Sequence, residues 1–187
     1  YYHRALALLD PRDHRRFEAH EALEGIYRMS GRRRDRMRHL DALRATAKQV
    51  GTPRSVCLAL LRTARFHEDE GHLARGLAVA RRAAETGHKS GMPLLEIEGE
   101  ALVSDFLREL GDVQGALSAC DRALTASDSK VNPGIPPRAR ADVLRSRGIL
   151  LRRVGRVREA VDAYVDAIAM FRKVGAVRQE ARCKDVL

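Results

Sequence analysis

Two histidines flanking a run of acidic residues form the stretch of this 187-residue chain that most resembles a metal site. The stretch is HEDEGH at 67–72. Zinc proteases place two histidines four residues apart, so that both rings lie on one face of a helix. His67 and His72 are five apart, a step that turns a helix by about 500°, and Gly71 interrupts the helix between them. The pattern therefore predicts a polar helix end and turn, with no bound metal and no cofactor.

Other arrangements that support catalysis are also missing from the sequence. No serine lies in a nucleophile-elbow pattern, no glycine-rich loop carries a phosphate-binding lysine, and no cysteine has an adjacent histidine. We therefore predict that the protein is not an enzyme. The three cysteines, Cys57, Cys120 and Cys183, are odd in number and widely spaced. This spacing favours buried free thiols in a reducing compartment over disulfides or metal ligands.

Long apolar segments are absent from the sequence. No run approaches the ~20 apolar residues that a membrane span needs, and no signal-peptide pattern opens the chain. Together with the cysteines, this predicts a cytoplasmic protein with no membrane partner. The chain begins without methionine and ends inside a predicted helix, so we expect it to be a fragment of a longer polypeptide.

Basic residues are concentrated in residues 31–54. The net charge of the chain is +10, and residues 31–54 hold eight basic residues against two acidic ones. The densest part, here called the basic patch, consists of Arg32, Arg33, Arg34, Arg36 and Arg38. Guanidinium groups make strong bidentate contacts, so the patch could bind phosphates or an acidic partner. The alternative interpretation is a solvated turn and the outer face of a helix.

Nucleic acid is the less favoured ligand of the basic patch. Nucleic-acid binding usually adds aromatic stacking or a recognised reading helix, and the chain has four tyrosines, four phenylalanines and no tryptophan. A basic helical module that binds nucleic acid or an acidic partner through residues 31–54 is therefore our second functional hypothesis.

Regularly spaced glycines divide the chain into units. Four of them recur at intervals of 40, 40 and 44 residues: Gly31, Gly71, Gly111 and Gly155. A second set falls about midway: Gly51, Gly91, Gly134 (inside the insertion VNPGIPP) and Gly175. A glycine that ends a helix adopts the left-handed conformation, which costs other residues roughly 1 kcal/mol. A period of this length indicates stacked helical hairpins.

The helix after Gly155 shows most clearly which residues the units bury. Its apolar residues recur at steps of four, three, four and three, which predicts one buried stripe: Val157, Val161, Tyr164, Ile168 and Phe171. Five residues past the turn glycine, the units carry Gly76, Ala116 or Ala160, but the first unit carries Arg36. This exception predicts looser or different packing in the first unit.

The last unit resembles the tetratricopeptide repeat at five positions: Gly148, Gly155, Ala160, Tyr164 and Ala167. Three features depart from that family: a period of 40 residues rather than ~34, no tryptophan, and Arg147 and His67 at positions that are usually apolar. The resemblance implies an all-α, right-handed α-solenoid of about ten helices paired as antiparallel hairpins. The 40-residue variant resembles the helical-repeat tails of large bacterial signalling proteins, such as serine/threonine kinases and multidomain ATPase-type regulators.

The resemblance also implies a single repeat domain over residues 1–187. We expect four units, at 12–51, 52–91, 92–134 and 135–175, followed by a helix at 177–187 that the sequence cuts short. Before the first turn glycine we expect two helices, Tyr1–Leu9 and Arg15–Met29.

Tetratricopeptide repeats bind partners on the concave face lined by the first helix of each pair, which implies a non-catalytic scaffold for protein–protein interaction. The partner would be a peptide or another domain of the same polypeptide. Counted back from the turn glycines, the residues on that face are Arg62, Arg65, Glu98, Asp105, Arg108, Arg145, Arg152 and Arg153. The set contains no asparagine, whereas the repeats that grip chaperone tails use lysines and asparagines, so we predict no chaperone-tail binding. The alternative is that these charges only keep the surface soluble.

Overall fold

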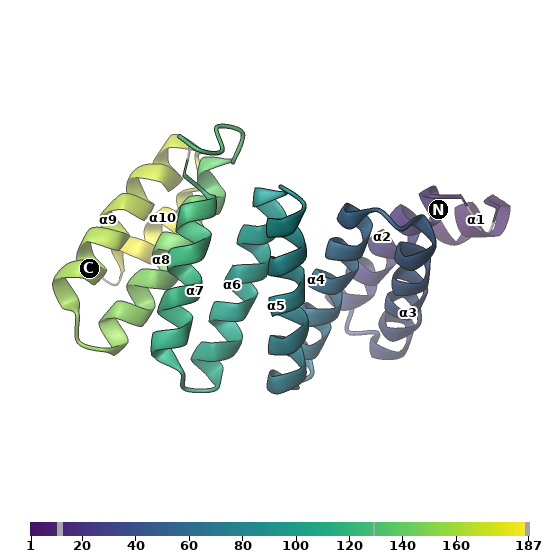
Figure 1. Ribbon diagram of the computed structural model, residues 1–187, viewed down its shortest axis with the longest axis horizontal. Coiled ribbons are helices and arrows are strands. Elements are labelled where there is room, and N and C mark those ends of the chain that lie inside the picture. Colours follow the sequence, from purple (N-terminus) through teal and green to yellow (C-terminus); the bar gives the residue numbers. More distant parts are fainter. Residues whose placement is uncertain (11–12, 129, 186–187) are drawn as a thin grey trace.

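The computed structural model describes residues 1–10, 13–128 and 130–185, and over this part of the chain it contains ten α-helices and no strand. The helices are α1 (Tyr2–Leu8), α2 (Arg15–Met29), α3 (Arg33–Val50), α4 (Pro53–Asp69), α5 (Leu73–Lys89), α6 (Pro93–Glu109), α7 (Val113–Ala126), α8 (Pro137–Arg153), α9 (Val157–Lys173) and α10 (Val177–Lys184). Figure 1 shows the helical hairpins from α2 to α9 stacked side by side along the long axis of the molecule, with α1 and α10 at the two ends. The predicted all-α solenoid of hairpins is confirmed. The boundaries of its four units stay predictions.

Seven glycines form the turns of the solenoid. Gly31, Gly71, Gly111 and Gly155 have φ angles between 67° and 85°, and Gly51, Gly91 and Gly175 have φ angles between 61° and 67°. Each lies just past the end of a helix, where this left-handed conformation satisfies the last carbonyl groups. The spacing of these glycines in the sequence therefore reflects a local backbone requirement.

Gly134 does not have the role that its position in the sequence predicted. It is not among the glycines with positive φ, and α7 already ends at Ala126. The side chain of Asn132 donates a hydrogen bond of 2.9 Å to the carbonyl oxygen of Ala126. Because this bond closes the helix end, the insertion before α8 needs no left-handed glycine there.

Most of the solenoid shares one apolar core, which runs from Cys57 in α4 to Cys183 in α10. Small residues let its helices approach closely. A Cβ atom at Gly148 in α8 would lie 2.8 Å from the ring of Tyr164 in α9. All three cysteines are buried and unbridged, as predicted, and burial raises the pKa of Cys57 and of Cys120 to about 11.

A second, smaller core holds the first hairpin against α4. It consists of Phe17, Leu40, Leu43, Ala47, Ala59 and Phe66. The first hairpin, α2 and α3, therefore does not share the apolar core of the other units.

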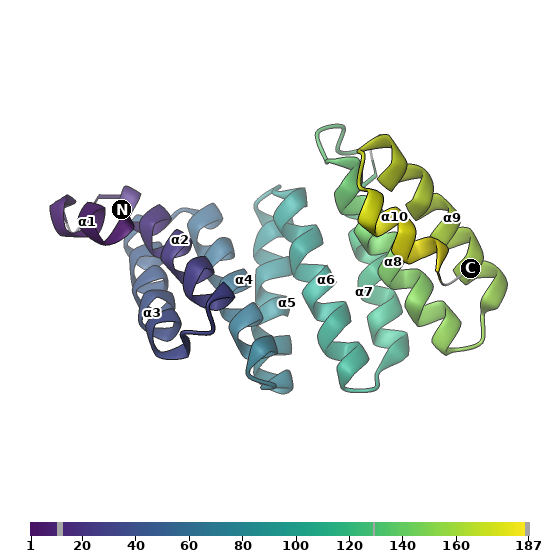
Figure 2. The ribbon, with the colours of Figure 1, turned by 180° about the vertical axis from the view of Figure 1, so that it is seen from behind.

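The stripe predicted on α9 is only partly correct. Tyr164 and Phe171 are buried, but Val157 and Val161 are 59% and 39% exposed. The eight-residue α10 begins next to the end of α9, so it does not reach the start of α9, where these valines lie (Figure 2). The buried face instead continues through small residues, of which Ala160 is 2% exposed.

No helix in the described part of the chain combines the length and the apolar character that a membrane crossing requires. The final helix was predicted to reach Leu187, but α10 ends at Lys184, and residues 186–187 lie outside the described residues.

Candidate functional site

The predicted binding residues lie on helices of one face of the solenoid. Helices α2, α4, α6 and α8 lie on the face seen in Figure 2, here called the first-helix face. Helices α3, α5, α7 and α9 lie on the opposite face, here called the second-helix face, which is seen in Figure 1. On the first-helix face, ion pairs link the helices of the N-terminal half, and a hollow lies between α6 and α8 in the C-terminal half.

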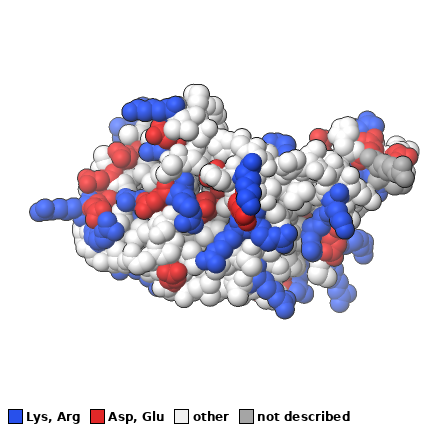
Figure 3. Space-filling view, viewed as in Figure 1, with Lys and Arg blue, Asp and Glu red and all other residues white. Residues whose placement is uncertain are grey.

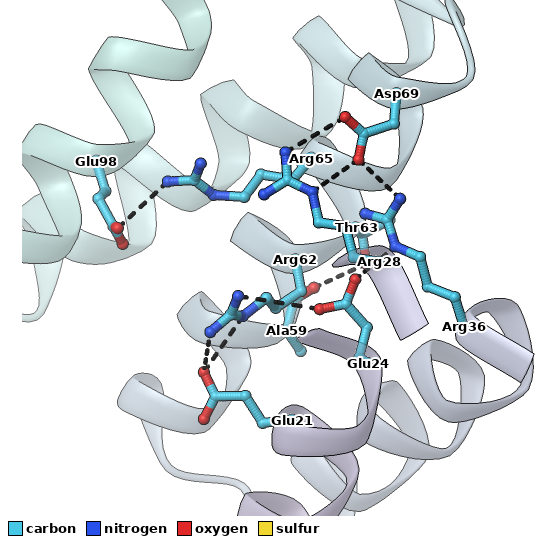
Figure 4. A network of polar contacts seen from close by, with 10 residues as sticks. All are labelled: Glu21, Glu24, Arg28, Arg36, Ala59, Arg62, Thr63, Arg65, Asp69 and Glu98. Atoms are coloured by element: carbon cyan, nitrogen blue, oxygen red, sulfur yellow. Dashed lines mark hydrogen bonds and ion pairs between the residues drawn. The ribbon is translucent and has the colours of Figure 1, made fainter. Parts of the chain in front are cut away.

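Ion pairs between neighbouring helices occupy the N-terminal half. The guanidinium of Arg62 in α4 lies 2.9 Å from the carboxylate of Glu21 in α2, and that of Arg65 lies 3.3 Å from Glu98 in α6 (Figure 4). Arg62, Arg65 and Glu98 were all predicted to face a partner. In this structure their charges are already paired within the chain.

A buried ion pair lies beneath this surface. Arg36 in α3 has a side chain only 6% exposed, and its Nε donates a hydrogen bond of 2.7 Å to Glu24, whose side chain is 0% exposed. Nη1 of Arg36 donates a second bond of 2.7 Å to Asp69 at the end of α4, which also accepts one from Arg28 (Figure 4). Burial alone would raise the pKa of Asp69, but the hydrogen bonds from the two arginines outweigh it and lower that pKa.

The interpretation of Arg36 as a solvated surface cation is therefore wrong. It stands where later units have Gly76, Ala116 or Ala160, and its long side chain fills the space between α2, α3 and α4. Its guanidinium also lies over the ring of Phe66, 5.1 Å from the centroid. The first unit does pack differently, but through a tight charged contact.

Most of the remaining basic patch is paired as well. Arg32 lies 2.7 Å from Asp35, Arg38 lies 3.8 Å from the same carboxylate, and Nε of Arg33 donates a bond of 2.6 Å to Glu70. Within residues 1–10, 13–128 and 130–185, Arg34 is the one member of the patch without an acidic partner. The chain therefore neutralises most of the patch by itself.

The C-terminal half of the first-helix face contains a hollow of about 400 Å³ between α6 and α8, here called the α6–α8 hollow. Four predicted residues line it: Arg65, Glu98, Asp105 and Arg145. Arg145 also borders an adjoining hollow of about 230 Å³, together with Asp105 and Arg108. The structure thus brings together five of the eight residues that were predicted from the turn glycines.

The charges at the α6–α8 hollow are unevenly matched. Burial raises the pKa of Asp105, although the positive charges of Arg108 and Arg145 oppose the shift. The guanidinium of Arg108 lies 3.5 Å from Asp105 and 3.0 Å from Glu109. Arg145 is half-buried, and no carboxylate of the described residues forms an ion pair with it. Of the arginines that line the hollow, Arg145 is therefore the one for which the described residues supply no ion pair.

Arg152 and Arg153 do not line the hollow. Both are exposed near the end of α8. The sequence prediction missed Arg138 and Asp142, which also line the hollow. Arg138 lies two turns before Arg145 on the same helix, and Asp142 lies one turn before it. Their spacing of four and then three residues on one helix was a signal that could have identified them.

The histidine pair that suggested a metal site is closer in space than the sequence predicted. The turn at Gly71 brings the rings of His67 and His72 to a centroid distance of 5.7 Å, so the argument that they diverge was wrong. Across the described residues, however, no group of three or more His, Cys, Asp or Glu side chains is arranged to hold a metal ion.

A second histidine pair, which the sequence did not reveal, lies inside the first hairpin. Nδ1 of His20 in α2 and Nδ1 of His39 in α3 are 3.0 Å apart, and both side chains are buried. Burial, followed by the neighbouring His39, lowers the pKa of His20 to about 4. Nε2 of His3 in α1 lies 2.7 Å from the hydroxyl of Tyr27 and extends this polar cluster.

Comparison with known proteins identifies the fold. The sequence matches no family model and no curated protein. The structure is similar to a signal transduction ATPase with numerous domains from Pyrococcus horikoshii that carries a tetratricopeptide repeat sensor, with a TM-score of 0.80 and 14% identity. That match covers 97% of this chain but only 28% of the ATPase.

Two shorter proteins are also similar in structure. One is BtubC (BKLC) from P. vanneervenii, with a TM-score of 0.63 and 13% identity over 90% of this chain and 76% of the other. The other is a kinesin light chain of Podosopora anserina with nearly identical tetratricopeptide-like repeats. Its TM-score is 0.69 and its identity is 15%, over 95% of this chain and 88% of the other. The resemblance seen in the turn glycines and small residues is thus confirmed: the chain is a tetratricopeptide-like helical repeat.

Proposed function

We propose that the protein is a non-catalytic interaction module that binds a partner through the first-helix face, at the α6–α8 hollow. One observation carries this proposal: Arg145 is half-buried at the hollow and forms no ion pair with any residue that the structure describes. A half-buried guanidinium with no carboxylate within ion-pair distance can form a strong charge-assisted hydrogen bond with a ligand that supplies one.

The lining of the hollow suits a protein segment. Leu94, Ile97 and Ala139 contribute aliphatic surface beside Arg145 and Asp105. Binding pockets for small molecules and side chains commonly combine such apolar walls with a few charged groups that fix orientation. The partner is therefore a peptide or another domain of the same polypeptide that offers an apolar side chain next to a carboxylate.

The neutralised basic patch weighs against the second hypothesis in its nucleic-acid form. Of the five arginines of the patch, Arg36 is buried in an ion pair and cannot reach a phosphate, whereas Arg32, Arg33 and Arg38 lie in exposed pairs that a phosphate would have to displace. Location in the cytoplasm stays a prediction from the sequence.

Affinity capture with matched variants tests the proposed site. Arg145→Glu/Arg152→Glu reverses the charge at the hollow and just beyond it, whereas Arg34→Glu/Arg158→Glu reverses two exposed arginines of α3 and α9. We expect the first variant to lose the proteins that the wild type captures, and the second to retain them. Equal recovery by all three forms would exclude the hollow as the binding site.

A further inference from the structure

The second-helix face carries a hollow of its own, between α3, α4 and α5, with a volume of about 540 Å³. Its floor contains the half-buried side chains of Val56, Leu60 and Val79. Three cations line it: Arg44, Lys48 and Arg82. None of the described residues that line it is acidic. Figure 3 shows lysine and arginine side chains projecting around uncharged surface over this part of the molecule. We call it the cationic hollow.

The cations of this hollow are largely free. Lys48 and Arg82 are exposed, and neither forms an ion pair with a described residue. Arg44 lies 3.5 Å from Asp41, but both side chains are more than half exposed, and such a pair contributes little. These charges therefore contrast with the internally paired arginines at the start of α3.

The next unit contains a hollow at the equivalent position, in which two basic side chains contact carboxylates of the chain. The residues 40 positions after Lys48 and Arg82 in the sequence are His88 and Arg122. His88 and Arg122 line a hollow of about 370 Å³ between α5, α6 and α7. At the same spacing, Val56 corresponds to Glu96 and Leu60 corresponds to Glu100.

Those two glutamates contact Arg122 and His88, which line the same hollow. Glu100 accepts two hydrogen bonds of 2.7 Å from Arg122, and Glu96 lies 3.0 Å from Nδ1 of His88. The hollow between α5, α6 and α7 thus shows which chemical groups can pair with basic side chains at this position. In the cationic hollow, aliphatic residues stand in place of both glutamates, and the carboxylates are missing.

We propose that the cationic hollow binds an acidic segment of a partner protein, with carboxylates that pair with Lys48 and Arg82 and aliphatic side chains that pack on Val56 and Leu60. This surface is separate from the first-helix face, and its tests are made on chains that carry Arg145→Glu, so that the α6–α8 hollow does not select peptides of the same class. The aliphatic floor favours protein over nucleic acid, because no aromatic side chain lines the hollow to stack on a base.

A two-residue exchange between units tests the proposal. Val56→Glu/Leu60→Glu gives the cationic hollow the glutamates that the next unit already carries, so Lys48 and Arg82 become paired within the chain. Circular dichroism should show unchanged helicity, because the next unit accommodates the same residues. A random peptide display library, selected in parallel against the wild-type cationic hollow and this variant, both in the Arg145→Glu chain, is the probe.

We expect selection on the wild type to yield peptides rich in Asp, Glu and aliphatic residues. These peptides should bind the variant at least tenfold more weakly. Lys48→Glu/Arg82→Glu should weaken the same peptides similarly, which provides a second test if the first variant unfolds. The control Arg34→Glu/Arg158→Glu reverses two exposed charges outside the hollow and should change the binding of these peptides little. Enriched peptides that are not acidic, or that bind the variants equally well, would overturn the proposal.

The reciprocal exchange tests the same idea by gain of binding. His88→Lys/Glu96→Val/Glu100→Leu should create a second cationic hollow and raise the capacity for the selected peptide from one to two per chain in calorimetry. Unchanged capacity would contradict it. A single-stranded oligonucleotide and vesicles with anionic lipid serve as alternative probes. If the oligonucleotide or the vesicles bind the wild type but not Val56→Glu/Leu60→Glu, and acidic peptides do not bind the wild type, the proposed class of partner is wrong.

Discussion

The first and the last hairpins of this solenoid have the same backbone arrangement but are held together by different chemistry. Between α2 and α3, the buried contacts include the Arg36–Glu24 ion pair and the His20–His39 pair. Between α8 and α9, a ring packs against a glycine, Tyr164 on Gly148. The repeat thus tolerates either a charged or an apolar contact between its helices.

The comparison also explains where binding capacity lies. In the N-terminal half, arginines such as Arg62 are paired with carboxylates of the chain itself. In the C-terminal half, Arg147 is paired with Asp121, but Arg145 forms no ion pair with a described residue. Arginine content alone therefore does not locate a binding surface in this protein. The proposed site instead rests on an arginine that lines a hollow and has no ion pair with a described residue, Arg145.

The largest predicted effect concerns the apolar hairpin. Ala167 is 0% exposed, so Ala167→Arg forces an unpaired charge into the core and should lower the free energy of unfolding by more than about 4 kcal/mol. Hydrogen exchange should show α8–α10 unfolding first. The control is Ala169→Arg at an exposed position of the same helix, which should cost less than about 0.5 kcal/mol. Unchanged melting of both variants would show that the assigned buried face of α9 is wrong.

The second prediction concerns the charged hairpin. Arg36→Ala leaves Glu24 buried without a partner and should cost about 3–5 kcal/mol, with hydrogen exchange rising first in α2 and α3. Arg34→Ala, two residues away and exposed, serves as its control and should change stability by less than about 0.5 kcal/mol. A similar small effect for both would mean that the buried ion pair does not hold this hairpin.

The sequence predicted the solenoid because its signals are local. A glycine that must adopt positive φ, such as Gly71 or Gly155, marks a turn regardless of what packs around it. The ion pairs could not be predicted in the same way, because Asp69 lies one unit after Arg36 and only packing brings them together. Arg36 was recognised as an exception, but its burial depends on a partner that no local pattern reveals.

The candidate site was predictable in part for a similar reason. The register of the first helices identified Asp105 and Arg145 because helical periodicity decides which face they share. It could not show that Arg62 is paired and Arg145 is not, since this depends on the neighbouring helix. The cationic hollow was detectable in principle, because a comparison at a spacing of 40 residues sets Val56 and Leu60 against glutamates.

The third prediction is a pH dependence confined to the first hairpin. The pKa of His20 is lowered from 6.5 to about 4 in the folded chain, so protonation favours the unfolded chain. Stability from this group is therefore complete above about pH 6.5 and is lost as the pH falls toward 4, by on the order of 2–3 kcal/mol. Hydrogen exchange at pH 7 and pH 5 should show loss of protection in α2 and α3 but not in α8 and α9.

The replacement His20→Gln is the control for that prediction. It removes the titrating group and should flatten the pH dependence of the first hairpin between pH 6.5 and 4. Equal pH dependence of the wild type and the variant would assign the effect to other groups, and equal loss of protection in both hairpins would contradict the comparison.

The smallest predicted effect concerns an ion pair at the surface. Arg65→Gln breaks a pair of 3.3 Å with Glu98, in which both partners are about a third exposed or more. Such pairs contribute ~0–1 kcal/mol, so chemical denaturation should show a change within that range. A cost as large as that of Arg36→Ala would mean that surface and buried pairs in this solenoid are equivalent.

Two matched arginines provide the most direct test of the account. Arg62 and Arg145 both lie on the first-helix face, the one paired with Glu21 and the other unpaired. With a partner recovered by the wild-type chain, calorimetry on Arg62→Gln and Arg145→Gln should show affinity unchanged by the first replacement and reduced at least tenfold by the second. Loss of affinity with Arg62→Gln and none with Arg145→Gln would contradict the claim that the unpaired arginine marks the binding site.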